Sequence, residues 1–486
     1  MEGFMLFNSL HFAIFLPIVF GIYWALPHKF RWPILLLASY YFYMSWNASY
    51  VVLILFTTAV SYFVALSLER IKGEKGKRAL LFLTLFVCLG ILFVFKYFNF
   101  FAESFSAITS RLGIPLHPIT LKLLLPVGIS FYTFQTLGYV IDVYRGNIEA
   151  EHNFGVYATF VSFFPQLVAG PIERTKNLLP QIKAEHKFDY ALATNGLKLM
   201  AWGFYKKLVI ADFLSPFVDK VFGNIYSYHG FSLVLAIFFF SIQIYCDFSG
   251  YSDIAKGTAN LFGIDLIKNF NSPYFSSSIH EFWSRWHISL STWFKDYVYI
   301  PLGGNRVSKI RHYRNLLITF LVSGLWHGAN WTFVIWGGLH GVAQIAENRL
   351  GLRRDLKRGA VAWWARVFLV FCFVMVAWVF FRAQNVNEAF YCFQHMFDGI
   401  SSPIEYLYCG FSERHNGIGI TKNTLVRIAG SMALLALFDY VSLKTDIIDW
   451  LNKKPTVTRH TFYCAIILIV AFFHAVGEVA FVYFQF

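Results

Sequence analysis

Two histidines lie in segments that are otherwise aromatic and apolar. His327 follows Trp326, and His287 follows Trp286. A neutral imidazole is the side chain best suited to take a proton near pH 7. Ionisable side chains are costly inside a bilayer, so a chain that keeps them there usually uses them. The two segments therefore indicate proton-transfer chemistry within a membrane.

The neighbours of His327 predict a polar site deep in a membrane-spanning segment. His327 comes about twelve residues after the basic cluster Arg311 and Arg314, and twelve helical residues rise about 18 Å into a core of about 30 Å. Asn330 and Trp331 follow at i+3 and i+4, which predicts that they share a helical face with His327. The Asn330 amide could orient the ring or hold an oxyanion. The alternative is a histidine hydrogen-bonded between packed helices.

A second polar group surrounds His287. His280 precedes it by seven residues, which predicts one helical face and a wet groove. The alternative is an interfacial helix whose polar face meets lipid headgroups, and we favour it for His280. Upstream, Asp247 and Asp253 close an apolar run, where they could pair with Arg285, orient a histidine or cap helix ends.

Several other kinds of chemistry lack their motifs. His280-Glu281 begins like a zinc-binding H-E-x-x-H motif, but Ser284 stands where the second histidine is needed. No G-x-S-x-G elbow, P-loop or G-x-G-x-x-G segment occurs. We therefore expect no bound metal and no bound cofactor.

The composition is that of a helical membrane protein. Of 486 residues, 57% are hydrophobic and only 14% are charged, against about 25% charged in typical soluble domains. The net charge of +14 comes from short loops between apolar segments, so it indicates membrane topology rather than nucleic-acid binding. We predict an all-α polytopic protein in the lipid bilayer, with residues 1–486 as one integral-membrane domain.

The hydropathy pattern predicts about 11 to 13 membrane-inserted helices, including re-entrant segments, around a tunnel. The candidate apolar segments are 10–26, 32–46, 50–68, 80–102, 119–141, 197–214, 231–247, 315–326 with 330–347, 363–382, 425–442 and 460–485. Basic loops after the first and third segments predict a plasma-membrane protein whose N-terminus lies outside. Residues 383–424 should form the longest external loop, in which a disulfide between Cys392 and Cys409 is an open possibility.

Two stretches look unlike spans. Two prolines and a glycine break Phe164–Pro171, which predicts a re-entrant loop that lines a cavity and includes Gln166. The stretch 269–301 mixes charged and aromatic residues, which suits an amphipathic helix at the interface or beside a cavity.

Eight segments in this order resemble the membrane-bound O-acyltransferase family. They are Met5–Ser9, Pro126–Gln135, Asp142–Arg145, Phe164–Pro171, Cys246–Tyr251, Arg285–Ser291, Tyr299–Gly304 and Leu325–Ala329. The likeness is strongest to the bacterial branch that O-acetylates alginate, and more distant to the D-alanyl transferases of lipoteichoic acid.

The resemblance implies a tunnel across the membrane, with His327 as the catalytic residue and His287 as the second functional histidine. It also implies a cytoplasmic acyl thioester donor (acetyl-CoA or an acyl carrier), an exported polysaccharide acceptor and periplasmic or extracellular acetylation partners. We expect these residues to line the donor site or tunnel: Arg285, Trp286, Asn330, Trp331, Asp247 and Gln166. Arg285, Lys295 and Arg306 could attract coenzyme A phosphates, or they could be topological charge alone.

We therefore expect an O-acyltransferase, most simply an O-acetyltransferase of exopolysaccharide in alginate biosynthesis. His327 would be the general base that helps a hydroxyl attack the thioester. One alternative is a D-alanyl transferase with a carrier-protein donor. The other is a transporter that passes a solute through a tunnel without chemistry.

Overall fold

The computed structural model describes residues 5–168, 170–352, 358–412, 417–475 and 481–482. The chain forms two compact units, the first comprising Met1–Met200 with Ile254–Ile267 and the second Ala201–Asp253 with Lys268–Phe486. About 75% of the chain is helical, and no strand occurs among the described residues. The all-α prediction is confirmed, whereas the single-domain interpretation stays a prediction.

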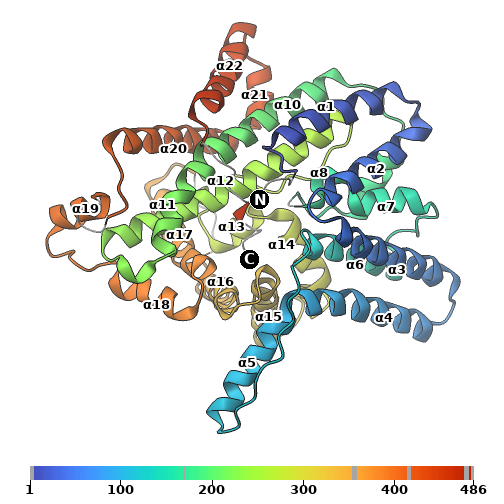
Figure 1. Cartoon of the computed structure of the whole chain (residues 1–486), viewed down its shortest axis with the longest axis horizontal. Helices are drawn as coiled ribbons and strands as arrows, with labels where there is room; N and C mark the ends of the chain where they lie inside the picture. Colours follow the sequence, from blue (N-terminus) through green and yellow to red (C-terminus); the bar gives the residue numbers. More distant parts are fainter. Residues whose placement is uncertain (1–4, 169, 353–357, 413–416, 476–480, 483–486) are drawn as a thin grey trace. The chain divides into compact units, whose positions relative to one another are not determined.

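The first unit consists mainly of helices that precede residue 201. They are α1 (Leu10–Ala25), α2 (Arg31–Met44), α3 (Val51–Arg70), α4 (Glu74–Leu92), α5 (Phe98–Arg111), α6 (Ile129–Tyr144), α7 (Phe154–Ser162), α8 (Phe164–Leu167), α9 (Thr175–Lys183) and most of α10 (Tyr190–Phe204). Helix α6 packs against both α3 and α4, and Figure 1 shows the three side by side in blue to teal.

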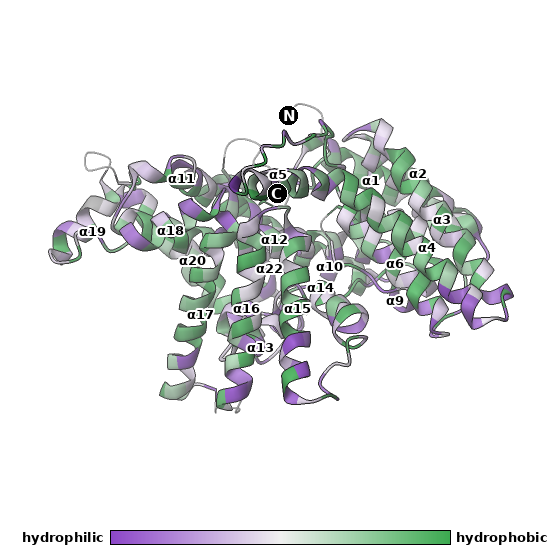
Figure 2. Ribbon diagram, turned by 90° about the horizontal axis from the view of Figure 1, so that it is seen from below, coloured by the Kyte–Doolittle hydropathy of each residue, from purple (hydrophilic) through white to green (hydrophobic). Residues whose placement is uncertain are grey.

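The second unit carries both histidines singled out above. Its helices are α11 (Asp212–Phe222), most of α12 (Phe231–Leu261), α13 (Ile279–Arg285), α14 (Ile288–Phe294), α15 (Lys309–His327), α16 (Trp331–Leu350), α17 (Val361–Arg382), α18 (Val386–His395), α19 (Pro403–Phe411), α20 (Lys422–Ser442), α21 (Ile447–Asn452) and α22 (Thr456–Phe473). Figure 2 shows α15, α16 and α17 running alongside one another, with hydrophilic residues where α15 begins. The predicted external loop therefore contains two helices, α18 and α19.

Six helical segments of the described chain are long and apolar enough to cross a membrane. They are Ala48–Arg70, Glu74–Arg111, Phe231–Leu261, Val361–Arg382, Lys422–Ser442 and Thr456–Phe473, and α1 is a shorter apolar helix. The larger predicted number of inserted helices, the re-entrant segments and the tunnel stay predictions.

Helix α12 is longer than its apolar run. Asp247 and Asp253 lie inside it rather than at its end, so the alternative that they cap helix ends is wrong. Two lysines supply the reason: Lys207 Nζ is 2.7 Å from Asp247 Oδ1, and Lys206 Nζ is 2.6 Å from Asp253 Oδ2. A paired, hydrogen-bonded charge can be buried in a helix where an isolated one cannot.

Breaks in the first unit follow glycine and proline. Helix α6 begins only at Ile129, because Gly128 adopts a left-handed conformation with φ 75°, which glycine tolerates best. A Cβ at Gly128 would lie 2.8 Å from the Leu167 carbonyl oxygen. Helix α7 ends at Ser162, and α8 contains only Phe164–Leu167. The predicted break in Phe164–Pro171 is thus confirmed, whereas its depth in a membrane stays a prediction.

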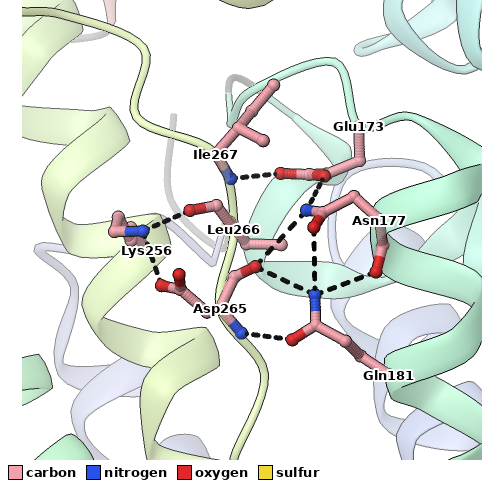
Figure 3. A network of polar contacts seen from close by, with 7 residues as sticks. All are labelled: Glu173, Asn177, Gln181, Lys256, Asp265, Leu266 and Ile267. Atoms are coloured by element: carbon pink, nitrogen blue, oxygen red, sulfur yellow. Dashed lines mark hydrogen bonds and ion pairs between the residues drawn. The ribbon is translucent and has the colours of Figure 1, made fainter.

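A saturated polar network secures the segment after α12 in the first unit (Figure 3). Buried Glu173 accepts from the Ile267 backbone N at 2.6 Å and from Asn177 Nδ2 at 2.7 Å. Gln181 exchanges hydrogen bonds with the Asp265 backbone, donating at 3.0 Å and accepting at 2.8 Å. We call Glu173, Asn177, Gln181, Lys256, Asp265 and Ile267 the Glu173 network. It holds an extended backbone segment whose polar groups would otherwise be unpaired.

Candidate active site

His327 is the last residue of α15, where the chain turns back into α16. Gly328 is extended at φ −162°, and the Asn330 side chain accepts from the Thr332 N to begin α16. Packing of α15 on α16 depends on Gly324 and Gly337, where any Cβ would collide with backbone of the opposite helix. The predicted helical face shared by His327, Asn330 and Trp331 is therefore wrong, because a turn separates them.

Aromatic rings surround the His327 imidazole, which is 5% exposed. Its ring centroid lies 5.0 Å from those of Trp326 and Trp336 and 5.3 Å from that of Phe381. All three pairs have steep interplanar angles, from 69° to 85°, as aromatic pairs prefer. This cage keeps bulk water from the imidazole, and polar interactions strengthen where water is excluded.

His287 lies between α13 and α14 in a left-handed conformation, with φ 43° and ψ 55°. The helix predicted to carry His280 and His287 on one face is therefore wrong. Backbone hydrogen bonds fix the break: Asn271 N donates to Arg285 O, and Ile288 N donates to Asn269 O, each at 2.9 Å. A non-glycine residue in this conformation is uncommon and is often found at functional sites.

Asn269 orients the His287 ring. The Asn269 Oδ1 accepts from the Ser289 N at 3.2 Å and lies 3.2 Å from His287 Nδ1. Because Oδ1 can only accept, Nδ1 carries the ring proton and Nε2 is the acceptor atom. Burial lowers the pKa of His287 to about 3, so this histidine is neutral at physiological pH.

Trp326 joins the two histidines into one cluster. Its ring centroid is 6.2 Å from that of His287 and 5.0 Å from that of His327. Both imidazoles thus belong to one aromatic core of the second unit. The sequence did not reveal this proximity, because a loop and two helices separate the histidines along the chain.

A cavity of about 820 Å³ opens beside this core. Its lining contains His280, Trp283, Ser284, Ile288, Leu290, Ser291, Thr292, Phe294, Lys295, Tyr299, Ile300, Gly303, Gly304, Asn305, Arg306, His312, Leu316, Thr319, Phe320, Ser323, Gln344 and Asn348. No aspartate or glutamate is among these residues, whereas exposed Lys295 and Arg306 are. The stretch 269–301 therefore lines a cavity, as one of its two interpretations predicted, although as short helices.

The inner wall of the cavity approaches His327. Ser323 lies in the lining and precedes His327 by one turn of α15, a rise of roughly 6 Å. Trp283 and Phe320 also line the cavity, and their ring centroids are 5.3 Å apart. A basic outer part and an aromatic inner part thus lead towards the caged histidine.

None of the six residues expected beside the donor or tunnel lines this cavity. Arg285 Nη2 pairs with Glu281 Oε1 at 2.7 Å, so its expected pairing with Asp247 or Asp253 is wrong. Trp286 is 1% exposed and packs on Trp378. Their roles at a tunnel stay predictions.

The other expected residues have structural contacts. Asn330 Nδ2 donates to the Gln384 carbonyl oxygen at 2.7 Å, and Trp331 is 51% exposed. Gln166, in the first unit, donates to the Phe160 carbonyl oxygen at 3.1 Å. Among the described residues no group of three or more His, Cys, Asp or Glu side chains could hold a metal ion. Cys392 is a buried free thiol, and the Cys409 side chain lies outside the described residues.

Sequence inspection missed His340 on α16. This residue is fully buried, and its Nδ1 accepts a hydrogen bond from Trp283 Nε1 at 3.2 Å. A signal was available, because His340 is a polar residue within the apolar segment 330–347. Asn269 was missed because only the folded loop brings it to His287.

The sequence matches known proteins. The model of the membrane-bound O-acyltransferase family matches residues 148–386. A probable alginate O-acetylase of Azotobacter vinelandii is 42% identical over 397 residues, or 81% of this chain and 78% of the relative. A peptidoglycan O-acetyltransferase of Helicobacter pylori is 38% identical, covering 79% and 78%. A teichoic acid D-alanyltransferase of Streptococcus thermophilus is 29% identical, covering 58% and 75%.

These matches define a class of integral membrane enzymes that transfer acyl groups to hydroxyls. The chain belongs to the membrane-bound O-acyltransferase family, and it is a multi-pass membrane O-acyltransferase.

Proposed function

We propose that this chain takes an acetyl group from a cytoplasmic thioester and passes it towards hydroxyls of an exported polysaccharide of the alginate type, with His327 as general base. Acetyl-CoA is the simplest donor. The names of the relatives at about 40% identity support an O-acetyl product and a glycan acceptor. The relative at 29% identity keeps D-alanyl transfer as the alternative.

The cavity is the observation that carries this proposal. Its outer part contains Lys295 and Arg306 and no carboxylate, which suits the phosphates of coenzyme A. Its inner wall reaches Ser323, one turn before His327. A donor with its phosphates at the basic end would therefore extend its thioester towards the imidazole.

The chemistry requires little beyond a base and a dry environment. His327 takes the proton from the acceptor hydroxyl as that oxygen attacks the thioester carbonyl carbon. The tetrahedral intermediate then collapses, the C–S bond breaks, and the coenzyme A thiolate leaves and takes up the proton. The aromatic cage around His327 limits competing attack by water, which would hydrolyse the thioester.

His287 has a supporting role in this proposal. Its neutral ring is fixed by Asn269 and lies across Trp326 from His327. From that position it can hold the Trp326 wall in place.

The positive-inside rule supports an orientation of the protein in the membrane. The loop from Lys295 to Arg314 is basic, so it is assigned to the cytoplasm, where thioesters are made. The same rule puts the N-terminus outside the plasma membrane. Periplasmic acetylation partners would receive the acyl group or deliver the polysaccharide.

A donor panel tests the proposal. The purified enzyme in nanodiscs is given an oligomannuronate acceptor with acetyl-CoA, an acetylated carrier protein or a D-alanylated carrier protein. Mass spectrometry then measures ester formation. We expect acetyl ester from acetyl-CoA. D-alanyl ester would favour the alternative transferase, and solute uptake into vesicles without any ester would favour the transporter.

A further inference from the structure

His340 lies in the same aromatic core as His327 but outside the cavity. Trp283 Nε1 donates to its Nδ1 at 3.2 Å. With Nδ1 as acceptor, the neutral ring carries its proton on Nε2. The Nε2 atom is buried and has no hydrogen-bond partner among the described residues. An unsatisfied buried polar atom is unfavourable, so packing alone is a poor reason for a histidine here.

Rings on several helices fix the His340 imidazole. It stacks nearly parallel on Phe282 at 6.1 Å and 7°, and Phe373 of α17 meets it edge-on at 5.4 Å. Its centroid is also 5.0 Å from that of Trp336, which is itself 5.0 Å from His327. His340 Nδ1, which accepts the hydrogen bond from the Trp283 indole, is therefore held rigidly next to the aromatic cage of His327.

Two ring partners of His340, Trp283 and Phe320, line the cavity, and Trp283 also donates the hydrogen bond to His340. The Trp283 side chain is 7% exposed and belongs to the lining, where it contacts Phe320. On its other side it packs against Trp336 at 5.6 Å. The indole thus forms the boundary between the cavity and the cage around His327, where the acyl end of a donor would lie.

We propose that His340 is a positioning residue that fixes Trp283 as the wall limiting the size of the acyl group at the inner end of the cavity. The inference rests on the proposed function, because it takes this cavity as the donor site. An indole held by one hydrogen bond cannot swing aside for a longer chain. The enzyme then accepts acetyl and excludes larger acyl groups.

The test compares kcat/KM for acetyl-, propionyl- and butyryl-CoA in the purified enzyme and its variants. Each extra methylene in a tight pocket changes specificity by about 10- to 200-fold. Trp283→Ala should therefore reduce the preference for acetyl over butyryl by about tenfold or more. His340→Phe keeps an aromatic ring but removes the acceptor, so it should reduce that preference by about fivefold, the worth of one hydrogen bond. His340→Gln should keep the wild-type preference for acetyl over butyryl, because the glutamine amide oxygen can accept the hydrogen bond from the Trp283 indole.

Phe373→Leu is the matched control, because it disturbs the packing of His340 without touching the hydrogen bond. Because the hydrogen bond from Trp283 remains, we expect its acyl preference to change much less than that of His340→Phe. If His340→Phe does not fold, Trp283→Phe removes the indole N–H from the other side and should shift the preference in the same direction.

The outcomes separate the two proposals. A wild-type enzyme that uses none of these thioesters contradicts the proposed function. A wild type that uses acetyl-CoA, with variants of unchanged acyl preference, contradicts only the role of His340 and Trp283. Equal shifts in His340→Phe and Phe373→Leu, or no rescue by glutamine, would also overturn it, since general loosening would then be the cause.

Discussion

Two polar clusters in this protein differ in how completely their hydrogen bonds are satisfied. In the Glu173 network, both carboxylate oxygens have donors and the Asp265 backbone is bound from both sides. Around His327, by contrast, Trp336 Nε1 and His340 Nε2 are buried without a hydrogen-bond partner among the described residues. Saturation favours a structural role, whereas unmet donors amid aromatic rings beside a cavity favour a functional one.

The comparison predicts different losses when each cluster is damaged. Substitutions in the Glu173 network should change stability and its pH dependence. Substitutions around His327 should change acyl transfer while the protein stays folded.

His327→Ala should have the largest effect. General-base catalysis contributes roughly 10²–10⁴-fold, so the O-acetyl content of surface polysaccharide should fall close to background in cells that express the variant normally. His395→Ala is the histidine control, because His395, the last residue of α18, pairs with Asp398 and lies outside the cavity. Equal acetylation in the two variants would make His327 a packing residue.

Removing the basic end of the cavity should have an intermediate effect. Exposed charge pairs contribute about 0.2–1 kcal/mol each, so Lys295→Ala with Arg306→Ala should raise the KM for acetyl-CoA about tenfold at low salt, with kcat nearly unchanged. Salt should shrink the difference. Lys309→Ala removes an exposed charge that does not line the cavity, and its KM should stay at the wild-type value; a matching rise there would mean that only net charge matters.

Glu173→Gln should alter the pH dependence of stability. Burial raises the pKa of Glu173 from 4.5 to about 7. The unfolded chain therefore loses this proton first, so the contribution of Glu173 is fully present below about pH 4.5 and is lost as pH rises to about 7. The change is on the order of 3 kcal/mol. Glutamine stays neutral, so the apparent Tm in detergent should fall less between pH 5 and 7.5 than in the wild type, and parallel profiles would contradict this assignment.

Asn330→Ala should have the smallest effect. Losing an N-cap costs about 1 kcal/mol, which lowers the Tm by a few degrees. Because Asn330 caps α16 and does not line the cavity, kcat should change less than about twofold. A kcat loss as large as that of His327→Ala would mean that Asn330 takes part in catalysis.

The sequence predicted the helical class, and it singled out His327 and His287, which the fold brings to the same tryptophan, because both signals are local. Hydropathy reveals apolar helices directly, and a histidine among tryptophans is visible without a fold. The failures concern residues that depend on distant partners. Asp247 and Asp253 stay inside α12 only because Lys207 and Lys206 pair with them. His287 leaves its helix because Asn269 and Asn271, which precede α13, pin the backbone.

The residues that were missed or misplaced from the sequence share the same cause. The role proposed for His340 depends on its hydrogen bond with Trp283, which forms only when α16 packs beside α13. Asn330 was assigned to a face that the turn after His327 abolishes. A turn of three residues was enough to separate side chains that helical periodicity had placed together.

The most direct test separates binding from chemistry in His327→Ala. The purified variant is loaded with radiolabelled acetyl-CoA, its Kd is measured, and ester formation with an oligosaccharide acceptor is followed over a single turnover. The account predicts a Kd within about twofold of the wild-type value and a transfer rate at least about 100-fold slower. A variant that transfers at the wild-type rate, or that fails only because it no longer binds the donor, would contradict His327 as the base.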